Sequence, residues 1–155
     1  MNAYADPSFL ISLYGRDPHS PAALAEVRGH KPIFVLTPFV EIEFTNALEL
    51  RVFHKEWAPV EARAVREEFV QDLSSGVLRI EGLPDEVFML ARRLSRRHTA
   101  KVGTRSLDII HVASALLLRP EVFYSFDERQ RRLAETEGLT VRPSFIEPRA
   151  TTARY

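Results

Sequence analysis

The sequence contains no cysteine, which excludes disulfide bonds, thiolate metal sites and cysteine nucleophiles. It has no basic amino-terminal region followed by an apolar core, and no apolar run approaches the ~18 residues of a membrane span. The formal net charge is zero, so the overall basic excess that usually marks a nucleic-acid-binding protein is missing. These absences favour a reducing compartment and predict a cytoplasmic protein without a membrane segment.

The composition is otherwise that of an ordinary globular protein: of the 155 residues, 45% are apolar and 27% are charged. A chain of this length is expected to form one domain. We place that domain at residues 1–143 and a polar tail, rich in proline and arginine, at residues 144–155. One basic cluster interrupts the even charge pattern and consists of Arg92, Arg93, Arg96, Arg97, Lys101 and Arg105. A solvated helix face and a phosphate-binding surface explain it equally well.

Short apolar runs alternate with stretches of helical periodicity along the whole chain. The runs predict strands at residues 3–5, 32–36, 76–80, 121–126 and 139–141. The periodic stretches predict helices at residues 7–14, 21–27, 38–53, 59–73, 84–97, 106–119 and 128–137. Strands alternating with helices indicate the α/β class, as an α/β/α sandwich around a central, mostly parallel sheet of four to five strands.

Two acidic residues stand where predicted strands end. Asp6 precedes Pro7, and Asp127 precedes the last helix, with Gln130 at the spacing of a capping box. Helix capping alone would explain both acids. However, ligands of parallel sheets gather beyond the carboxyl ends of the strands, so both also lie where a site is expected.

Two further acids have no evident role in local helix chemistry. Asp108 is on a helix that is apolar almost all the way round. Glu43 falls on a stripe with Val40 and Leu50, whereas Glu41 is on the opposite, polar side. A buried carboxylate must find partners, be protonated or hold a cation. An ion pair with a basic residue could account for either acid alone.

Taken together, the four acids would repel one another at one edge of one sheet. A divalent cation is the natural way to hold them, and oxygen-only ligation suits Mg²⁺ or Mn²⁺. Such sites hydrolyse phosphodiester bonds, so we expect metal-dependent cleavage of a nucleic-acid strand. Ser8 and Ser125 could support the ligands by hydrogen bonds. His111 is interpreted as a packed, hydrogen-bonded residue outside the metal shell.

Four segments in order resemble the PIN-domain family, and within it the VapC-type toxins of toxin–antitoxin pairs. They are Tyr4–Leu10 (YADPSFL), Thr37–Leu48 (TPFVEIEFTNAL), Arg105–Ala113 (RSLDIIHVA) and Ser125–Gln130 (SFDERQ). The resemblance implies a homodimeric Mg²⁺- or Mn²⁺-dependent endoribonuclease, which could form a heterotetramer or larger assembly with an antitoxin. Carried over by motif, the catalytic and metal-binding residues would be Asp6, Glu43, Asp108 and Asp127.

Several partner contacts follow as expectations. RNA phosphates would contact Arg92, Arg93, Arg96, Arg97 and Arg105. The carboxy-terminal segment of the antitoxin would insert a basic residue, best an arginine, among the four acids, because a guanidinium can bridge carboxylates. Phe53, Trp57 and Phe69 are candidates for the dimer or antitoxin surface. Alternative functions are a PIN-fold nuclease of RNA maturation or decay, and a non-catalytic partner-binding module.

Overall fold

A parallel sheet runs through the middle of the molecule, with its strands in the order β3-β2-β1-β4-β5. The computed structural model describes residues 1–144, so the predicted tail lies outside the described residues except for Ser144. The strands are β1 (Asn2–Ala5), β2 (Ile33–Leu36), β3 (Leu78–Ile80), β4 (Val122–Tyr124) and β5 (Val141–Arg142). The predicted α/β class and parallel sheet are therefore confirmed.

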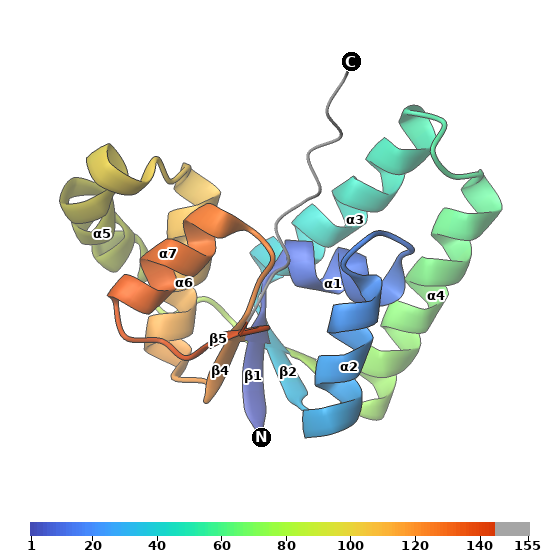
Figure 1. Cartoon of the computed structure of the whole chain (residues 1–155), viewed down its shortest axis with the longest axis horizontal. Coiled ribbons are helices and arrows are strands. Elements are labelled where there is room, and N and C mark those ends of the chain that lie inside the picture. The colour runs from blue at the N-terminus through green and yellow to red at the C-terminus, as the bar shows by residue number, and fades with distance from the viewer. Residues whose placement is uncertain (145–155) are drawn as a thin grey trace, which may run out of the picture.

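Helices cover both sides of this sheet (Figure 1). One side carries α1 (Pro7–Tyr14), α2 (Ser20–His30), α3 (Pro38–Phe53) and α4 (Pro59–Ser75). The other side carries α5 (Val87–Val102), α6 (Ser106–Leu118) and α7 (Glu128–Thr136). Among residues 1–144, none of these helices combines the length and the apolar character that a membrane crossing requires.

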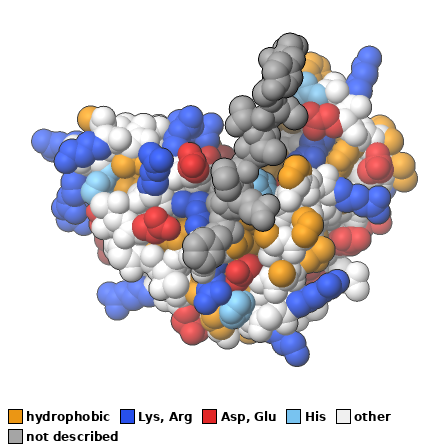
Figure 2. All heavy atoms as spheres, in the orientation of Figure 1, with side chains coloured by type: hydrophobic (Ala, Val, Ile, Leu, Met, Phe, Trp, Pro, Cys, Tyr) orange, Lys and Arg blue, Asp and Glu red, His pale blue; other side chains and the backbone are white. Residues whose placement is uncertain are grey.

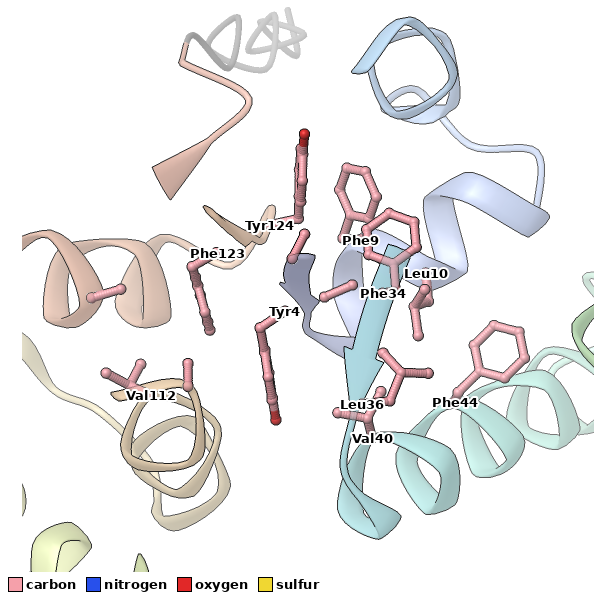
Figure 3. Packing of buried hydrophobic residues seen from close by; sticks show 14 of the residues in the cluster. Tyr4, Phe9, Leu10, Phe34, Leu36, Val40, Phe44, Val112, Phe123 and Tyr124 are labelled. Carbon is pink, nitrogen blue, oxygen red and sulfur yellow. The ribbon is translucent and has the colours of Figure 1, made fainter. Parts of the chain in front are cut away.

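Alternating side chains of the central strands build the core on both faces of the sheet (Figure 3). On one face, Tyr4 of β1 stacks on Phe123 of β4 with ring centroids 5.5 Å apart. On the other face, Phe9 of α1 packs against Phe34 and Tyr124 at centroid distances of 5.8 and 4.7 Å. Successive side chains of a strand point to opposite faces, so neighbouring residues serve different helix layers.

Two helices differ most from their predicted bounds. The helix predicted at residues 84–97 is α5, which begins at Val87 and continues through His98 to Val102. It ends at Gly103, whose φ of +72° favours glycine. The helix predicted at residues 21–27 is α2, which continues to His30 and therefore includes Gly29. A glycine inside a helix costs only about 1 kcal/mol relative to alanine, which packing of the helix readily offsets.

The strand order reverses direction at β1. The chain goes from β1 to β2 and β3 on one side, and then returns to place β4 and β5 on the other side. The carboxyl ends of β1 and β4 therefore flank the switch point, where parallel sheets form a ligand crevice. Asp6 follows β1 there, and Ser125 follows β4.

Candidate active site

A pocket of about 300 Å³ opens at this switch point. Its lining combines residues from four separate parts of the chain: Asp6, Pro7, Ser8, Ile11, Glu43, Asn46, Ala47, Leu50, Arg105, Asp108, Asp127 and Gln130. All four acids singled out from the sequence thus face the same cavity. The fold brings them together because each is on, or next to, an element that begins at the carboxyl edge of the sheet.

Asp6 is the most deeply buried of these acids, with no exposed surface. Its Oδ1 accepts a hydrogen bond of 2.9 Å from the Phe9 backbone N–H, which caps α1. The Ser8 hydroxyl donates to both carboxylate oxygens at 2.7 and 2.8 Å, and the Ser125 hydroxyl donates to Oδ2 at 2.8 Å. Burial nevertheless raises the pKa of Asp6 to about 6. Both serines lie where the sequence argument expected supporting hydroxyls.

Asp127 caps α7, as its position predicted. Its Oδ1 accepts from the backbone N–H groups of Arg129 and Gln130 at 2.9 and 3.0 Å. The expected capping box is not formed by Gln130, whose side-chain amide instead donates to Asp108 Oδ1 at 3.3 Å. The Oε1 atom of Gln130 is buried without a hydrogen-bond partner among the described residues. The tertiary contact with α6 therefore takes this side chain away from its own helix end.

Asp108 has a local role that the sequence argument missed. Its Oδ2 accepts a 2.8 Å hydrogen bond from the Arg105 backbone N–H, so Asp108 caps its own helix, α6. The Arg105 guanidinium contacts the same carboxylate, with Nε 3.2 Å from Oδ2 and Nη2 3.3 Å from Oδ1. Its Nη2 also lies 3.5 Å from Asp127 Oδ2. The hydrogen bonds and the charge of Asp108 raise the pKa of Arg105.

Glu43 lies on the wall of the pocket rather than over the core, which corrects the stripe inferred from the sequence. Leu50 on that stripe is 45% exposed. The buried stripe of α3 is rotated from it and consists of Val40, Phe44 and Leu48. Glu41 is not part of the pocket lining. A stripe at helical spacing can face a cavity as well as a core, and only the packing of α3 decides between them.

The partner of Glu43 is a histidine. Its Oε2 contacts Nε2 of His111, which is on α6 and has no exposed surface. His111 Nδ1 in turn lies 2.9 Å from the Tyr4 hydroxyl. His111 is therefore packed and hydrogen-bonded, as interpreted from the sequence, but it also contacts one of the acids. The signal available in the sequence was its place one turn after Asp108 on the same buried helix.

A family model of the PIN domain matches residues 3–136. The chain belongs to the PIN domain family. No curated protein has a detectable sequence match to it.

Solved structures share the fold of this PIN domain. The toxin VapC20 of Mycobacterium tuberculosis, described as cleaving the sarcin–ricin loop, is 19% identical, with a TM-score of 0.66 and coverage of 89% of this chain and 96% of that one. FitAcB from Neisseria gonorrhoeae is 13% identical, with a TM-score of 0.66 and coverages of 90% and 95%. VapBC2 from Rickettsia felis, bound to a DNA fragment from their promoter, is 12% identical, with a TM-score of 0.63 and coverages of 91% and 97%.

The basic cluster of this PIN domain divides into two parts. Only Arg105 lines the pocket. The others are exposed on α5, and Figure 2 shows basic side chains gathered over that end of the molecule; they are Arg92, Arg93, Arg96, Arg97 and Lys101. Arg97 Nη1 lies 3.4 Å from Glu137 Oε1. Contacts of this face with phosphates would therefore be made outside the pocket.

The aromatic residues expected at a partner surface of the PIN domain differ in exposure. Phe53 is 76% exposed at the end of α3. Phe69 is buried, which contradicts its assignment to the surface, because its ring stacks on Phe44 at 4.6 Å. Trp57 is half-buried, with the Arg51 guanidinium 4.9 Å from the centre of its ring. Only Phe53 of the three is therefore open to a partner.

The chemistry of the pocket suits a hard divalent cation, since its charged acceptors are carboxylate oxygens. Among the described residues 1–144, however, no three acidic or histidine side chains are gathered closely enough to form a ligand cluster by themselves. Three of the acids contact partners of the same chain instead: His111 contacts Glu43, and Arg105 contacts Asp108 and Asp127. The guanidinium shows that a cation is accommodated between two of these acids. The donors thus fit the metal in chemical kind, and all four line one pocket.

Proposed function

We propose that this PIN domain is a metal-dependent endoribonuclease and the toxin of a type II toxin–antitoxin pair. The observation that carries the proposal is the convergence of four carboxylates on one pocket at the carboxyl edge of a PIN fold. The structural similarity to VapC20, a sarcin–ricin loop cleaving toxin, supports RNA as the substrate and a toxin as the biological role.

Mg²⁺ or Mn²⁺ would be held by Asp6, Glu43, Asp108 and Asp127. When bound, the ion would supply positive charge that makes a water more acidic and neutralises charge on the phosphodiester. The remaining work falls to the chain itself. Ser8 and Ser125 fix the orientation of the Asp6 carboxylate through three hydrogen bonds. Because burial raises the pKa of Asp6 to about 6, positive charge in the pocket would favour its ionised form.

Arg105 is suited to handle the phosphate of the substrate. Its guanidinium is two thirds exposed, although it pairs with Asp108 and Asp127. A planar guanidinium binds phosphate oxygens in the same bidentate manner as carboxylate oxygens. Arg105 can therefore turn from the acids to a phosphate when RNA enters. The basic face of α5, with Arg92, Arg93, Arg96 and Arg97, would contact phosphates farther along the strand.

The partner would be a small antitoxin whose carboxy-terminal segment brings a basic residue, best an arginine, to the acids. Support comes from Arg105, which demonstrates that a guanidinium can pair with Asp108 and Asp127 together. The exposed Phe53 on α3 suits an apolar contact outside the pocket. We further propose a homodimer that forms a heterotetramer or a larger assembly with the antitoxin, in the cytoplasm.

Cleavage of structured RNA by an Asp108→Asn variant tests the activity. Asparagine keeps an oxygen that can cap α6, so the fold is preserved while the charge is lost. We expect Mg²⁺-dependent cleavage by the wild type and by the control Asp85→Asn, which changes an exposed loop acid, and loss of cleavage by Asp108→Asn. Equal activity of Asp108→Asn and wild type would sink the proposal, and undiminished cleavage in EDTA would sink the metal dependence.

Calorimetric titration with Mn²⁺ tests the alternative of a non-catalytic module. The matched pair is Glu43→Gln and Glu41→Gln, which change neighbouring acids on α3 inside and outside the pocket. We expect Mn²⁺ binding to be weakened only by Glu43→Gln. No Mn²⁺ binding by the wild type would favour the non-catalytic module.

Expression in a bacterial host tests the toxin role against RNA maturation or decay. A toxin should arrest growth, and co-expression of a small reading frame adjacent to its gene should relieve the arrest. Growth that is unaffected by an active nuclease would favour the maturation or decay function.

A further inference from the structure

A row of buried polar groups lies behind the Glu43 carboxylate. His111 Nε2 contacts Glu43 Oε2, and His111 Nδ1 lies 2.9 Å from the Tyr4 hydroxyl. The Tyr4 hydroxyl is also 3.4 Å from Thr37 Oγ1. Tyr4, Thr37 and His111 have no exposed surface. The row therefore joins the pocket to the interior through β1, α6 and the start of α3.

The donor and acceptor capacities of these groups determine the direction of the hydrogen bonds. An ionised Glu43 carboxylate only accepts, so His111 must carry a proton on Nε2. In a neutral imidazole the other nitrogen is an acceptor, and the Tyr4 O–H is the donor that faces it. The Tyr4 hydroxyl keeps its proton, because burial raises its pKa. For the neutral ring, Tyr4 thereby favours the tautomer that can bind Glu43.

Thr37 extends this row to the helix that carries Glu43. It occupies the N-cap position of α3, yet its side chain makes no capping hydrogen bond. Its hydroxyl instead lies within hydrogen-bond distance of Tyr4. Both the start of α3 and the Glu43 side chain, which follows six residues later on the same helix, are thus tied to the pair of Tyr4 and His111.

We propose that His111, held in place by Tyr4, is the positioning residue that sets the place of the Glu43 carboxylate in the pocket. The proposal rests on the proposed function insofar as Glu43 is a metal-binding residue. His111 follows Asp108 by one turn of α6. One helix therefore supplies one acid of the site and orients a second acid that belongs to a different helix. A purely structural His111 would fill space and would not influence the site.

The first test is the tautomer of His111 in the metal-free wild type. Long-range ¹H–¹⁵N correlation spectra of protein labelled with ¹⁵N-histidine distinguish the two neutral tautomers, and the spectrum of His111→Gln assigns the signal. We expect protonation on Nε2 in the wild type and a loss of this preference in Tyr4→Phe. Protonation on Nδ1 in the wild type would overturn the proposal, whatever the protein does to RNA.

The second test compares two amide substitutions in calorimetric titrations with Mn²⁺. The amide nitrogen of His111→Gln can reach the place of Nε2, whereas that of His111→Asn reaches only the place of Nδ1. We expect His111→Asn to weaken Mn²⁺ binding by about 10-fold or more, as the loss of a group that orients a ligand does, and His111→Gln to restore most of it. Equal affinities of the two folded variants would indicate a structural role only and would overturn the proposal.

A tyrosine on the neighbouring strand provides the matched control. Tyr4→Phe should weaken Mn²⁺ binding by about 5-fold, comparable to the loss of one buried neutral hydrogen bond. The side chain of Tyr124 is as deeply buried as that of Tyr4, and its hydroxyl donates to Glu26 at 3.3 Å. Tyr124→Phe removes this hydroxyl and should leave Mn²⁺ binding unchanged. If Glu43→Gln binds Mn²⁺ as the wild type does, the metal role of Glu43 fails, while the tautomer measurement still decides the positioning role.

Discussion

The two sides of the acidic pocket are held in different ways. Asp6 is held by the hydroxyls of Ser8 and Ser125, and Glu43 is held by the buried imidazole of His111. Asp108 and Asp127 share a charged partner, the guanidinium of Arg105, which is two thirds exposed. The partners of the first side are anchored in the fold, whereas the second side is partly neutralised by a guanidinium that solvent can reach.

This difference explains how four carboxylates can share one pocket. Ser125 and His111 have no exposed surface, so these partners of Asp6 and Glu43 stay in place when a ligand binds. The Arg105 side chain is two thirds exposed, so Arg105 can leave when a cation takes its place beside Asp108 and Asp127 or when a phosphate binds it. The first side is therefore a permanent feature of the fold, and the second side is adjustable.

Asp6→Asn is expected to have the largest effect on activity, because it alters the permanent side. Asparagine can keep the hydrogen bond to the Phe9 N–H but lacks the negative charge. We expect the rate of Mg²⁺-dependent RNA cleavage to fall by on the order of 100-fold or more. This loss is larger than that usually caused by removing a residue that only orients a metal ligand. The measurement is initial cleavage rates at saturating Mg²⁺, with Asp85→Asn as the control. A loss below 10-fold would argue against Asp6 as a metal-binding residue.

The same residue should govern the pH dependence of stability in the metal-free protein. A carboxyl whose pKa rises from 3.8 to about 6 on folding binds its proton more tightly in the native state. The free energy of unfolding should therefore fall as the pH rises from about 4 to about 6, by up to about 3 kcal/mol. Urea unfolding in EDTA measures this. Asp6→Asn cannot titrate and should lack this decrease; an identical decrease in both proteins would assign it to another group.

Arg105→Ala alters the adjustable side and should have a smaller effect of opposite sign. The Arg105 backbone N–H still caps α6 through Asp108. Since the guanidinium competes for Asp108 and Asp127, we expect Mn²⁺ to bind about 3-fold more tightly in the absence of RNA, within the range of an exposed ion pair. Calorimetric titration compares the Mn²⁺ affinity of Arg105→Ala with that of the control Arg129→Ala, which changes an exposed arginine on α7. Weaker Mn²⁺ binding by Arg105→Ala would mean that Arg105 organises the acids instead of competing for them.

Removal of charge from α5 should have the smallest effect, because this face lies outside the pocket. The measured quantity is the slope of the logarithm of RNA affinity against the logarithm of salt concentration. In the double variant Arg92→Ala/Arg96→Ala this slope should be less steep than in the wild type, by about 0.7 for each lost phosphate contact. Arg63→Ala, an exposed arginine on α4, is the control. A slope unchanged from the wild type would leave α5 as a solvated face, and the rate of cleavage at saturating RNA should not change in either case.

Local patterns were sufficient to predict the alternation of strands and helices and the family. Apolar runs bounded by Asp6-Pro7 and Thr37-Pro38 predicted where two strands give way to helices, and α1 and α3 begin at those prolines. The meeting of the four acids in one pocket was also predictable, because parallel strands bring their carboxyl ends to one edge. Their roles as metal-binding residues remain predictions.

The partners of the acids were not predictable, because they come from other elements or from a competition between local and tertiary contacts. Asp108 was expected to lack a local role, although its spacing from Arg105 suits a cap. Gln130 was expected to cap its own helix, but it donates to Asp108 across the interface of α6 and α7. The stripe of Glu43 could face a core or a cavity, since helical period alone cannot distinguish the two.

The sequence by itself determined which residue types recur at which spacing, and therefore the order of the elements, the parallel sheet and the acids at its carboxyl edge. Only the tertiary structure decided what each acid contacts. Hydrogen bonds and ion pairs depend on side chains within about 3 Å of each other, and those of Glu43 and His111 belong to helices far apart along the chain. The fold creates that contact, because it brings one side chain of α3 and one of α6 together at the pocket.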